Sequence, residues 1–107
     1  MRVLFDQGTP APLRRALVVG HTVETAYERG WSELQNGELI AAAEAAGFEV
    51  FVTTDRNLKY QQNLTARTLS IVVLLTTSWP RIQLSLPAVL AALESAYAGA
   101  YQEVHIQ

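Results

Sequence analysis

Two aspartates that each follow a predicted strand are the residues of this chain best suited to chemistry. Asp6 and Asp55 are the only aspartates among ten acidic residues. Asp6 directly follows the apolar run Val3–Phe5, and Asp55 follows the run Val50–Thr54. The carboxyl ends of parallel strands lie along one edge of a sheet, and ligands bind in crevices there. If the two strands are neighbours, we expect both carboxylates to face one cleft.

A pair of carboxylates in one cleft requires either a shared proton or a cation. Two such charges about 4 Å apart repel by roughly 4 kcal/mol at an effective dielectric constant near 20. A hard divalent ion such as Mg²⁺ or Mn²⁺ is the natural partner of ligands that offer only oxygen. Glu38, in the first turn of a predicted helix, and Asn36, a neutral oxygen donor, are the further candidate ligands.

Each of these residues also has an ordinary structural explanation. Aspartate after a strand commonly forms a turn, and Asp55 could cap a helix that starts near Leu58. Asn36 suits the N-cap of a helix. The helix dipole favours a carboxylate in the first turn, which accounts for Glu38. The residue types alone leave both explanations open.

The polar segment 56–63 after the second aspartate is a candidate contact for a substrate. It contains Arg56, Tyr60 and the chain's one lysine, Lys59. Beside a metal cleft, the two cations could hold phosphates and the tyrosine could stack on a base. An exposed helix face explains the same polar residues without any ligand.

Composition excludes several classes of protein. The chain has 107 residues, of which 50% are hydrophobic and 17% charged, with a net charge of -2 and no cysteine. One domain over residues 1–107 is expected, without disulfides, zinc thiolates or a cysteine nucleophile. The slightly acidic balance argues against a DNA-coating protein. Serine-hydrolase, phosphate-loop and dinucleotide fingerprints are absent from the sequence. No apolar run could span a membrane, so we expect a cytoplasmic protein.

The order of elements predicts an α/β fold. Short apolar strands alternate with helical stretches, which calls for parallel pairing and right-handed crossovers. We therefore expect one three-layer α/β/α domain with a mostly parallel sheet of four or five strands. The expected strands are 3–5, 21–26, 49–54, 70–75 and an edge strand 103–106. The expected helices start at Pro10, at Asn36, at Leu58 and at Pro80. In the last of these helices, the residues expected to face the core are Leu84, Val89, Leu90 and Leu93.

Four short motifs occur in an order that is typical of a known family. The first strand runs into Asp6, and the pair Gly20–His21 opens the second strand. The segment Asn36–Leu39 occupies the position of an Asp-x-Glu-Ile helix start, and Thr53–Leu58 matches a strand-end Thr-x-Asp-x-x-Leu. From Met1 to about Leu93, the chain resembles the PIN-like domain family, short predicted toxin-type ribonucleases akin to the RNase-like domain of Mut-seven proteins.

The resemblance implies a PIN-like fold and a ribonuclease that depends on Mg²⁺ or Mn²⁺. It also implies a bacterial toxin–antitoxin system, with RNA as the substrate and a small antitoxin protein as the partner. Asp6 and Asp55 match the metal-binding carboxylates of the family, and with Glu38 they would form the catalytic set. Asn36 stands where the family often has aspartate, so the site carries less negative charge unless Glu38 compensates.

Two functions therefore follow as hypotheses. In the first, Asp6, Asp55 and either Glu38 or Asn36 hold the metal, and the polar segment 56–63 positions RNA. In the second, the chain is a catalytically degenerate PIN-like module that binds a partner protein or forms a homodimer. The second would use the Trp79 region and the alanine-rich last helix, whose small residues permit close approach of another helix.

Overall fold

The computed structural model describes residues 1–58 and 67–106. Five strands form one sheet in the order β2-β1-β3-β4-β5, and every neighbouring pair is parallel. The predicted α/β class and the parallel pairing are confirmed. The strands are β1 (Arg2–Phe5), β2 (Thr22–Thr25), β3 (Val50–Thr53), β4 (Ser70–Leu74) and β5 (Tyr101–Val104).

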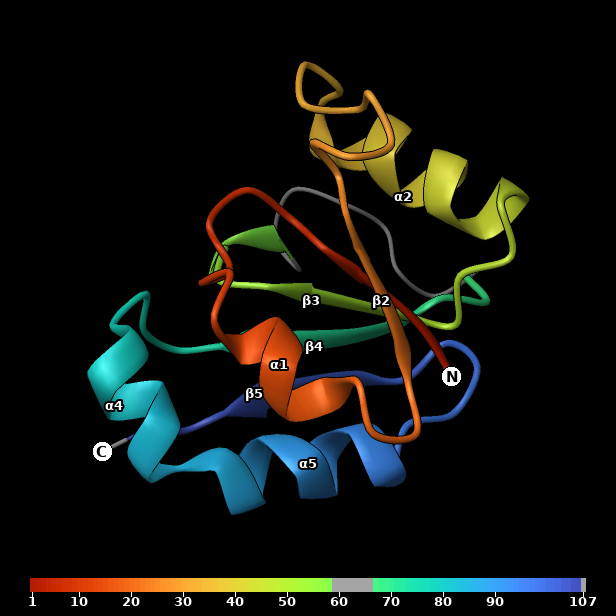
Figure 1. Ribbon diagram of the computed structural model, residues 1–107. Helices are drawn as coiled ribbons and strands as arrows, with labels where there is room; N and C mark the ends of the chain where they lie inside the picture. The colour runs from red at the N-terminus through yellow and green to blue at the C-terminus, as the bar shows by residue number, and fades with distance from the viewer. Residues whose placement is uncertain (59–66, 107) are drawn as a thin grey trace.

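Helices cover both faces of this sheet, as the three-layer prediction requires. Helix α2 lies on one face, and α1, α4 and α5 lie together on the other (Figure 1). Parallel strands need such crossovers because consecutive strands must start at the same edge. The helices are α1 (Leu13–Leu17), α2 (Asn36–Ala45), α4 (Trp79–Leu84) and α5 (Leu86–Glu94).

The central strands are buried on both faces, which is why they are continuous apolar runs. Every residue of β3 and β4 is buried. Along β3, Val50 and Val52 pack with α1 and α5, whereas Phe51 packs with α2. The sheet therefore separates two apolar clusters, one packed on each of its faces.

The last predicted helix is wrong as a single element. The chain forms α4 and α5 with a break at Ser85, whose φ of -115° and ψ of 20° are not helical. Pro87 explains the break, because inside one long helix it would lack an N–H and its ring would clash with the carbonyl of Gln83. At the start of α5 the missing N–H costs nothing. Leu84, expected in the core, is 84% exposed, and Ile82 is buried in its place.

Two smaller differences concern the ends of the chain's elements. The first helix begins at Leu13, not at Pro10, and Pro12 takes its N-cap position. The edge strand is Tyr101–Val104, two residues earlier than predicted, because this register pairs it with β4. Of the predicted helix 58–66, only Leu58 is among the described residues. Within the described ranges, no helix is long and apolar enough to cross a membrane.

Candidate functional site

The two aspartates lie at the point where the strand order of the sheet reverses. From β1 the chain first adds β2 on one side and then β3 on the other, so the crevice between β1 and β3 is a preferred place for ligands. Phe5 pairs with Val52 in the register of these strands. Asp6 directly follows β1, and Asp55 follows β3 by two residues. The two strands are therefore neighbours, which was the condition for the two aspartates to lie at one place on the sheet edge.

Two threonines hold the carboxylate of Asp6. Its Oδ1 accepts hydrogen bonds from the Thr9 N–H (3.0 Å) and from the Thr9 hydroxyl (2.7 Å). Its Oδ2 accepts a hydrogen bond from the Thr53 hydroxyl. Both threonines are buried. Thr9 thus hydrogen-bonds Asp6, and the N-cap position of α1 is taken by Pro12.

Asp55 is fixed by its own neighbours and by Asn36. The Asp55 N–H donates to Thr53 Oγ1 (3.1 Å), so one hydroxyl group links the two aspartates. Asn36 Nδ2 donates to Asp55 Oδ2 (2.9 Å), and the Asn57 N–H donates to Oδ1 (2.9 Å). The structure therefore brings together three of the four predicted metal ligands.

The fourth predicted ligand, Glu38, is used locally. Its carboxylate accepts a hydrogen bond from the Gln35 N–H (3.3 Å) at the N-cap of α2. Asn36 is the first residue of the helix and not its cap, which leaves its side chain to reach Asp55. Glu38 lies in the first turn of α2, as its structural explanation expects, and the hydrogen bond to the N-cap residue is an additional contact.

Within residues 1–58 and 67–106, the donors to both aspartates are neutral backbone N–H, hydroxyl and amide groups. Among the described residues, no ion pair involves Asp6 or Asp55. The guanidinium of Arg56 donates to the Leu75 carbonyl. Lys59 and Tyr60, the other predicted substrate contacts, lie outside the described residues. Carboxylates that form no ion pair within the described residues attract cations.

The oxygen donors of the crevice fit a magnesium ion. Mg²⁺ keeps several waters and commonly takes only one or two carboxylates from the protein. Asp6 and Asp55 supply these, and Asn36 offers an amide oxygen. In the part of the chain that the structure describes, no group of three or more His, Cys, Asp or Glu side chains gathers for a metal. The site is therefore a two-carboxylate site, poorer in charge than a site with three acids.

A cavity of about 160 Å³ opens beside Asp6 and Asn36. Gly8 lies on its wall, where a Cβ atom would stand 2.6 Å from Thr54 Oγ1, so only glycine fits without a shift. Trp31 lines the same cavity and packs against the apolar cluster that includes α2. The cavity is thus lined by Asp6 together with residues of α2 and of the loops after β1 and β2.

Sequence reasoning missed the role of the two threonines. Thr9 follows Asp6 by three residues, a spacing at which aspartate side chains accept hydrogen bonds from the backbone in local turns. Thr53 precedes Asp55 by two residues, but its contact with Asp6 depends on pairing between β1 and β3. The contact between Thr9 and Asp6 could therefore be predicted from their spacing in the sequence, whereas the contact between Thr53 and Asp6 could not.

No family model, curated protein or solved structure matches this chain. The fold and the site therefore define only a class: an α/β protein with a five-stranded parallel sheet and two aspartates at its strand-order reversal.

Proposed function

We propose that this chain is a metal-dependent endoribonuclease of toxin–antitoxin type with a PIN-like fold. One observation carries the proposal: Asp6 and Asp55 follow adjacent strands at the reversal point and are linked by Thr53, and their donors among the described residues are neutral. The family resemblance of the four motifs supports RNA as the substrate and a small antitoxin protein as the partner.

Each residue has a defined task in this proposal. Asp6, Asp55 and the amide oxygen of Asn36 hold Mg²⁺ or Mn²⁺. When bound, the ion stabilises charge on the scissile phosphate and lowers the pKa of a water nucleophile. Thr9 and Thr53 fix the orientation of Asp6 before the ion arrives, which reduces the cost of assembling the site.

The remaining predicted residues act around this centre. Arg56 and Lys59 would contact RNA phosphates, and Tyr60 would stack on a base. Arg56 would first have to leave the Leu75 carbonyl. Glu38 would join the catalytic set only by giving up its hydrogen bond to Gln35.

A calorimetric titration with MnCl₂ and MgCl₂ tests the metal site. Wild-type protein should bind a divalent ion saturably, and Asp6→Asn and Asp55→Asn should each abolish detectable binding. Glu33→Gln removes the same charge from an exposed loop position and should bind as the wild type does. Absence of binding to folded wild-type protein would overturn the metal proposal.

Cleavage of RNA tests the activity itself. Wild-type protein with Mn²⁺ should cut single-stranded RNA, a chelator should stop the reaction, and Asp6→Asn should be inactive while its circular dichroism stays unchanged. If folded Asp6→Asn protein still cleaves RNA at the wild-type rate, the assigned residues are not the catalytic ones.

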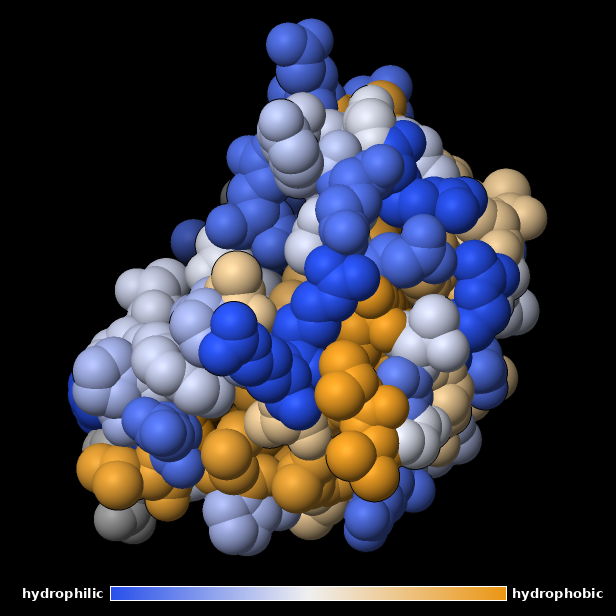
Figure 2. Space-filling model, viewed as in Figure 1, coloured by the Kyte–Doolittle hydropathy of each residue, from blue (hydrophilic) through white to orange (hydrophobic). Residues whose placement is uncertain are grey.

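A partner-binding module is the second candidate, and an exposed apolar face favours it. Val18 and Val19 after α1 and Leu84 at the end of α4 are 55%, 87% and 84% exposed. Figure 2 shows apolar side chains gathered over α1, α4 and α5 on this side of the molecule. Large exposed apolar patches often mark protein interfaces. Trp79, in contrast, is half-buried against the core.

Light scattering after size-exclusion chromatography distinguishes a homodimer from a module that binds a different partner protein. A homodimer should dissociate in Val19→Lys, whereas Thr22→Lys on the exposed start of β2 should leave it intact. A wild-type monomer at all concentrations would contradict the homodimer.

A further inference from the structure

The outer surface of α1 and α5 carries one cation and one anion that no described part of the chain pairs. Arg15 of α1 and Glu94 of α5 are both exposed. Among the described residues, neither side chain takes part in an ion pair or a hydrogen bond. The neighbouring Arg14, in contrast, pairs with Glu28 at 2.8 Å. The surface over these two helices therefore offers one charge of each sign to a partner.

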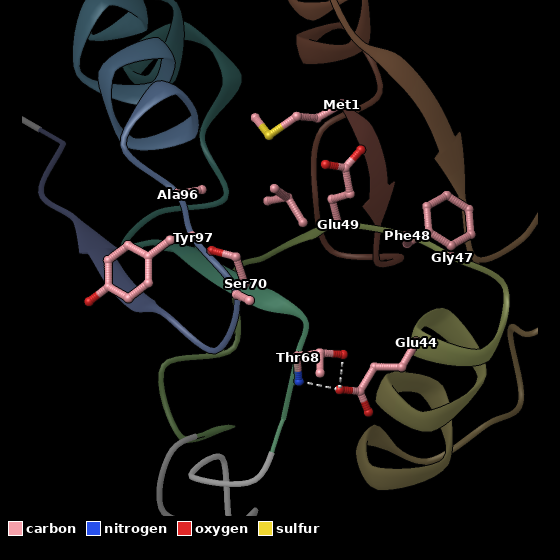
Figure 3. A pocket seen from close by; sticks show the side chains of 11 residues that line it. Met1, Glu44, Gly47, Phe48, Glu49, Thr68, Ser70, Ala96 and Tyr97 are labelled. Carbon is pink, nitrogen blue, oxygen red and sulfur yellow. Dashed lines mark hydrogen bonds between the residues drawn. The ribbon is translucent and has the colours of Figure 1, made fainter.

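Glu44, on the other side of the sheet, is a carboxylate that the chain itself satisfies. It lies beside the pocket at the amino ends of the strands, which has a volume of about 330 Å³ (Figure 3). Its Oε1 pairs with the Arg67 guanidinium (3.0 Å), and its Oε2 accepts from the Thr68 N–H (2.6 Å) and hydroxyl (3.0 Å). The charge of Glu44 is thus compensated within the chain, whereas no described group compensates Arg15 or Glu94.

Helical spacing places Glu94 on the flank of α5 that faces away from β5. Leu86, Leu90 and Glu94 are four residues apart, so they lie along one side of the helix. The other flank, with Ala88 and Ala92, borders a pocket that α5 shares with β5. Both leucines pack against the apolar cluster that includes α1. Helix α1 lies on the same face of the sheet as α5 (Figure 1), so the two unpaired charges share one side of the molecule.

Exposed apolar side chains accompany these charges. Val18 and Val19 directly follow α1, and Leu84 ends α4 immediately before α5; all three are exposed. Figure 2 shows apolar side chains gathered over these helices, next to strongly hydrophilic ones. Burial of apolar surface drives protein association, and charged groups around it determine the partner and the register.

We propose that this surface binds the same surface of a second copy of the chain, with Arg15 of each copy paired to Glu94 of the other. In a twofold contact, residue i meets residue j and residue j meets residue i. An axis in the contact plane, midway between Arg15 and Glu94, therefore forms both ion pairs at once. An entirely acidic or entirely basic partner would compensate only one of the two charges. The inference rests on the second candidate function, whose partner it identifies, and is independent of the proposed nuclease function.

Sedimentation equilibrium of the full chain measures the Kd of the dimer and tests this contact. Arg15→Glu and Glu94→Arg each place like charges opposite each other at both symmetric positions, so each should raise the Kd at least about tenfold. The double variant Arg15→Glu/Glu94→Arg restores both pairs with exchanged signs and should return the Kd close to the wild-type value. Glu33→Arg makes the same charge change as Glu94→Arg at an exposed loop position before α2 and should keep the wild-type Kd.

Both substituted side chains are exposed, so the circular dichroism of each variant should match that of the wild type. A wild-type monomer at all accessible concentrations would overturn this contact together with the homodimer. A wild-type dimer whose Kd is unchanged by either single substitution, or a double variant as weak as the single ones, would overturn the contact alone. In that case, dissociation by Val19→Lys would still support a homodimer through the apolar side chains.

Discussion

Thr53 is the residue that links the two halves of the candidate site. Its hydroxyl donates to Asp6 and accepts from the Asp55 N–H, and it is buried at the end of β3. A valine of similar shape would leave both groups without this partner. The position therefore matters for stability before any ligand is considered.

Replacing Thr53 by valine should lower the free energy of unfolding by about 1–3 kcal/mol, the cost of leaving partly buried polar groups unsatisfied. Urea titration monitored by circular dichroism measures the change. The matched substitution Thr22→Val, at an exposed position of β2, should have little effect. Equal stabilities of the two variants would show that the link between the aspartates contributes nothing.

Asn36 decides how much charge the site carries. Asn36→Asp would replace the amide donor to Asp55 by a second carboxylate. Without metal, the repulsion should lower the melting temperature; with Mn²⁺, the extra ligand should tighten binding by about tenfold, or 1.4 kcal/mol. Thermal melts with and without Mn²⁺ measure both effects. A variant that is destabilised without gaining metal affinity would contradict a ligand role for residue 36.

At the scale of elements, Glu44 fastens α2 to the segment that leads into β4. Besides Arg67 and Thr68, the Leu69 N–H donates to its carboxylate (3.2 Å). Desolvation by partial burial acts to raise the pKa of Glu44. The donors of residues 67–69 outweigh it and hold the pKa below the ordinary value of 4.5.

This lowered pKa gives Glu44 a defined effect on acid stability. The folded state binds the proton more weakly than the unfolded chain, so the ionised carboxyl stabilises the fold fully above about pH 5. The gain is lost as the pH falls through the lowered pKa. Urea titrations from pH 7 to pH 3 should therefore show the stability difference between wild type and Glu44→Gln shrinking towards low pH. A difference that is constant over this range would contradict the assignment.

At the scale of the molecule, a single sheet carries both apolar clusters. Trp79 packs on the cluster of α1, α4 and α5, and Trp31 packs on the cluster of α2. Both clusters share the strands of a single sheet, so we expect them to unfold together. The two tryptophans thus report on opposite faces of one structure.

Unfolding should be two-state when each face is observed separately. In Trp31→Phe and Trp79→Phe, the remaining tryptophan reports one face, and its fluorescence should follow the same transition as circular dichroism within each variant. A fluorescence midpoint that differs from the circular dichroism midpoint in either variant would show that one face opens before the other.

The sequence by itself determined the class of the fold and the four principal strands, because apolar runs between helical stretches report burial on both faces of a parallel sheet. It also placed Asp6 and Asp55 at strand ends, since this depends only on local order along the chain. The split at Ser85 follows from Pro87, which the prediction of one helix from Pro80 did not take into account.

Only the tertiary structure decided which strands are neighbours, and hence that Thr53 reaches Asp6 from β3. It also determined which groups Asn36 and Glu38 contact. Glu38 turns to Gln35 within its own helix, whereas Asn36 turns to Asp55 across the fold. Contacts within one turn follow from spacing, but contacts between elements depend on strand order, which local propensities do not encode.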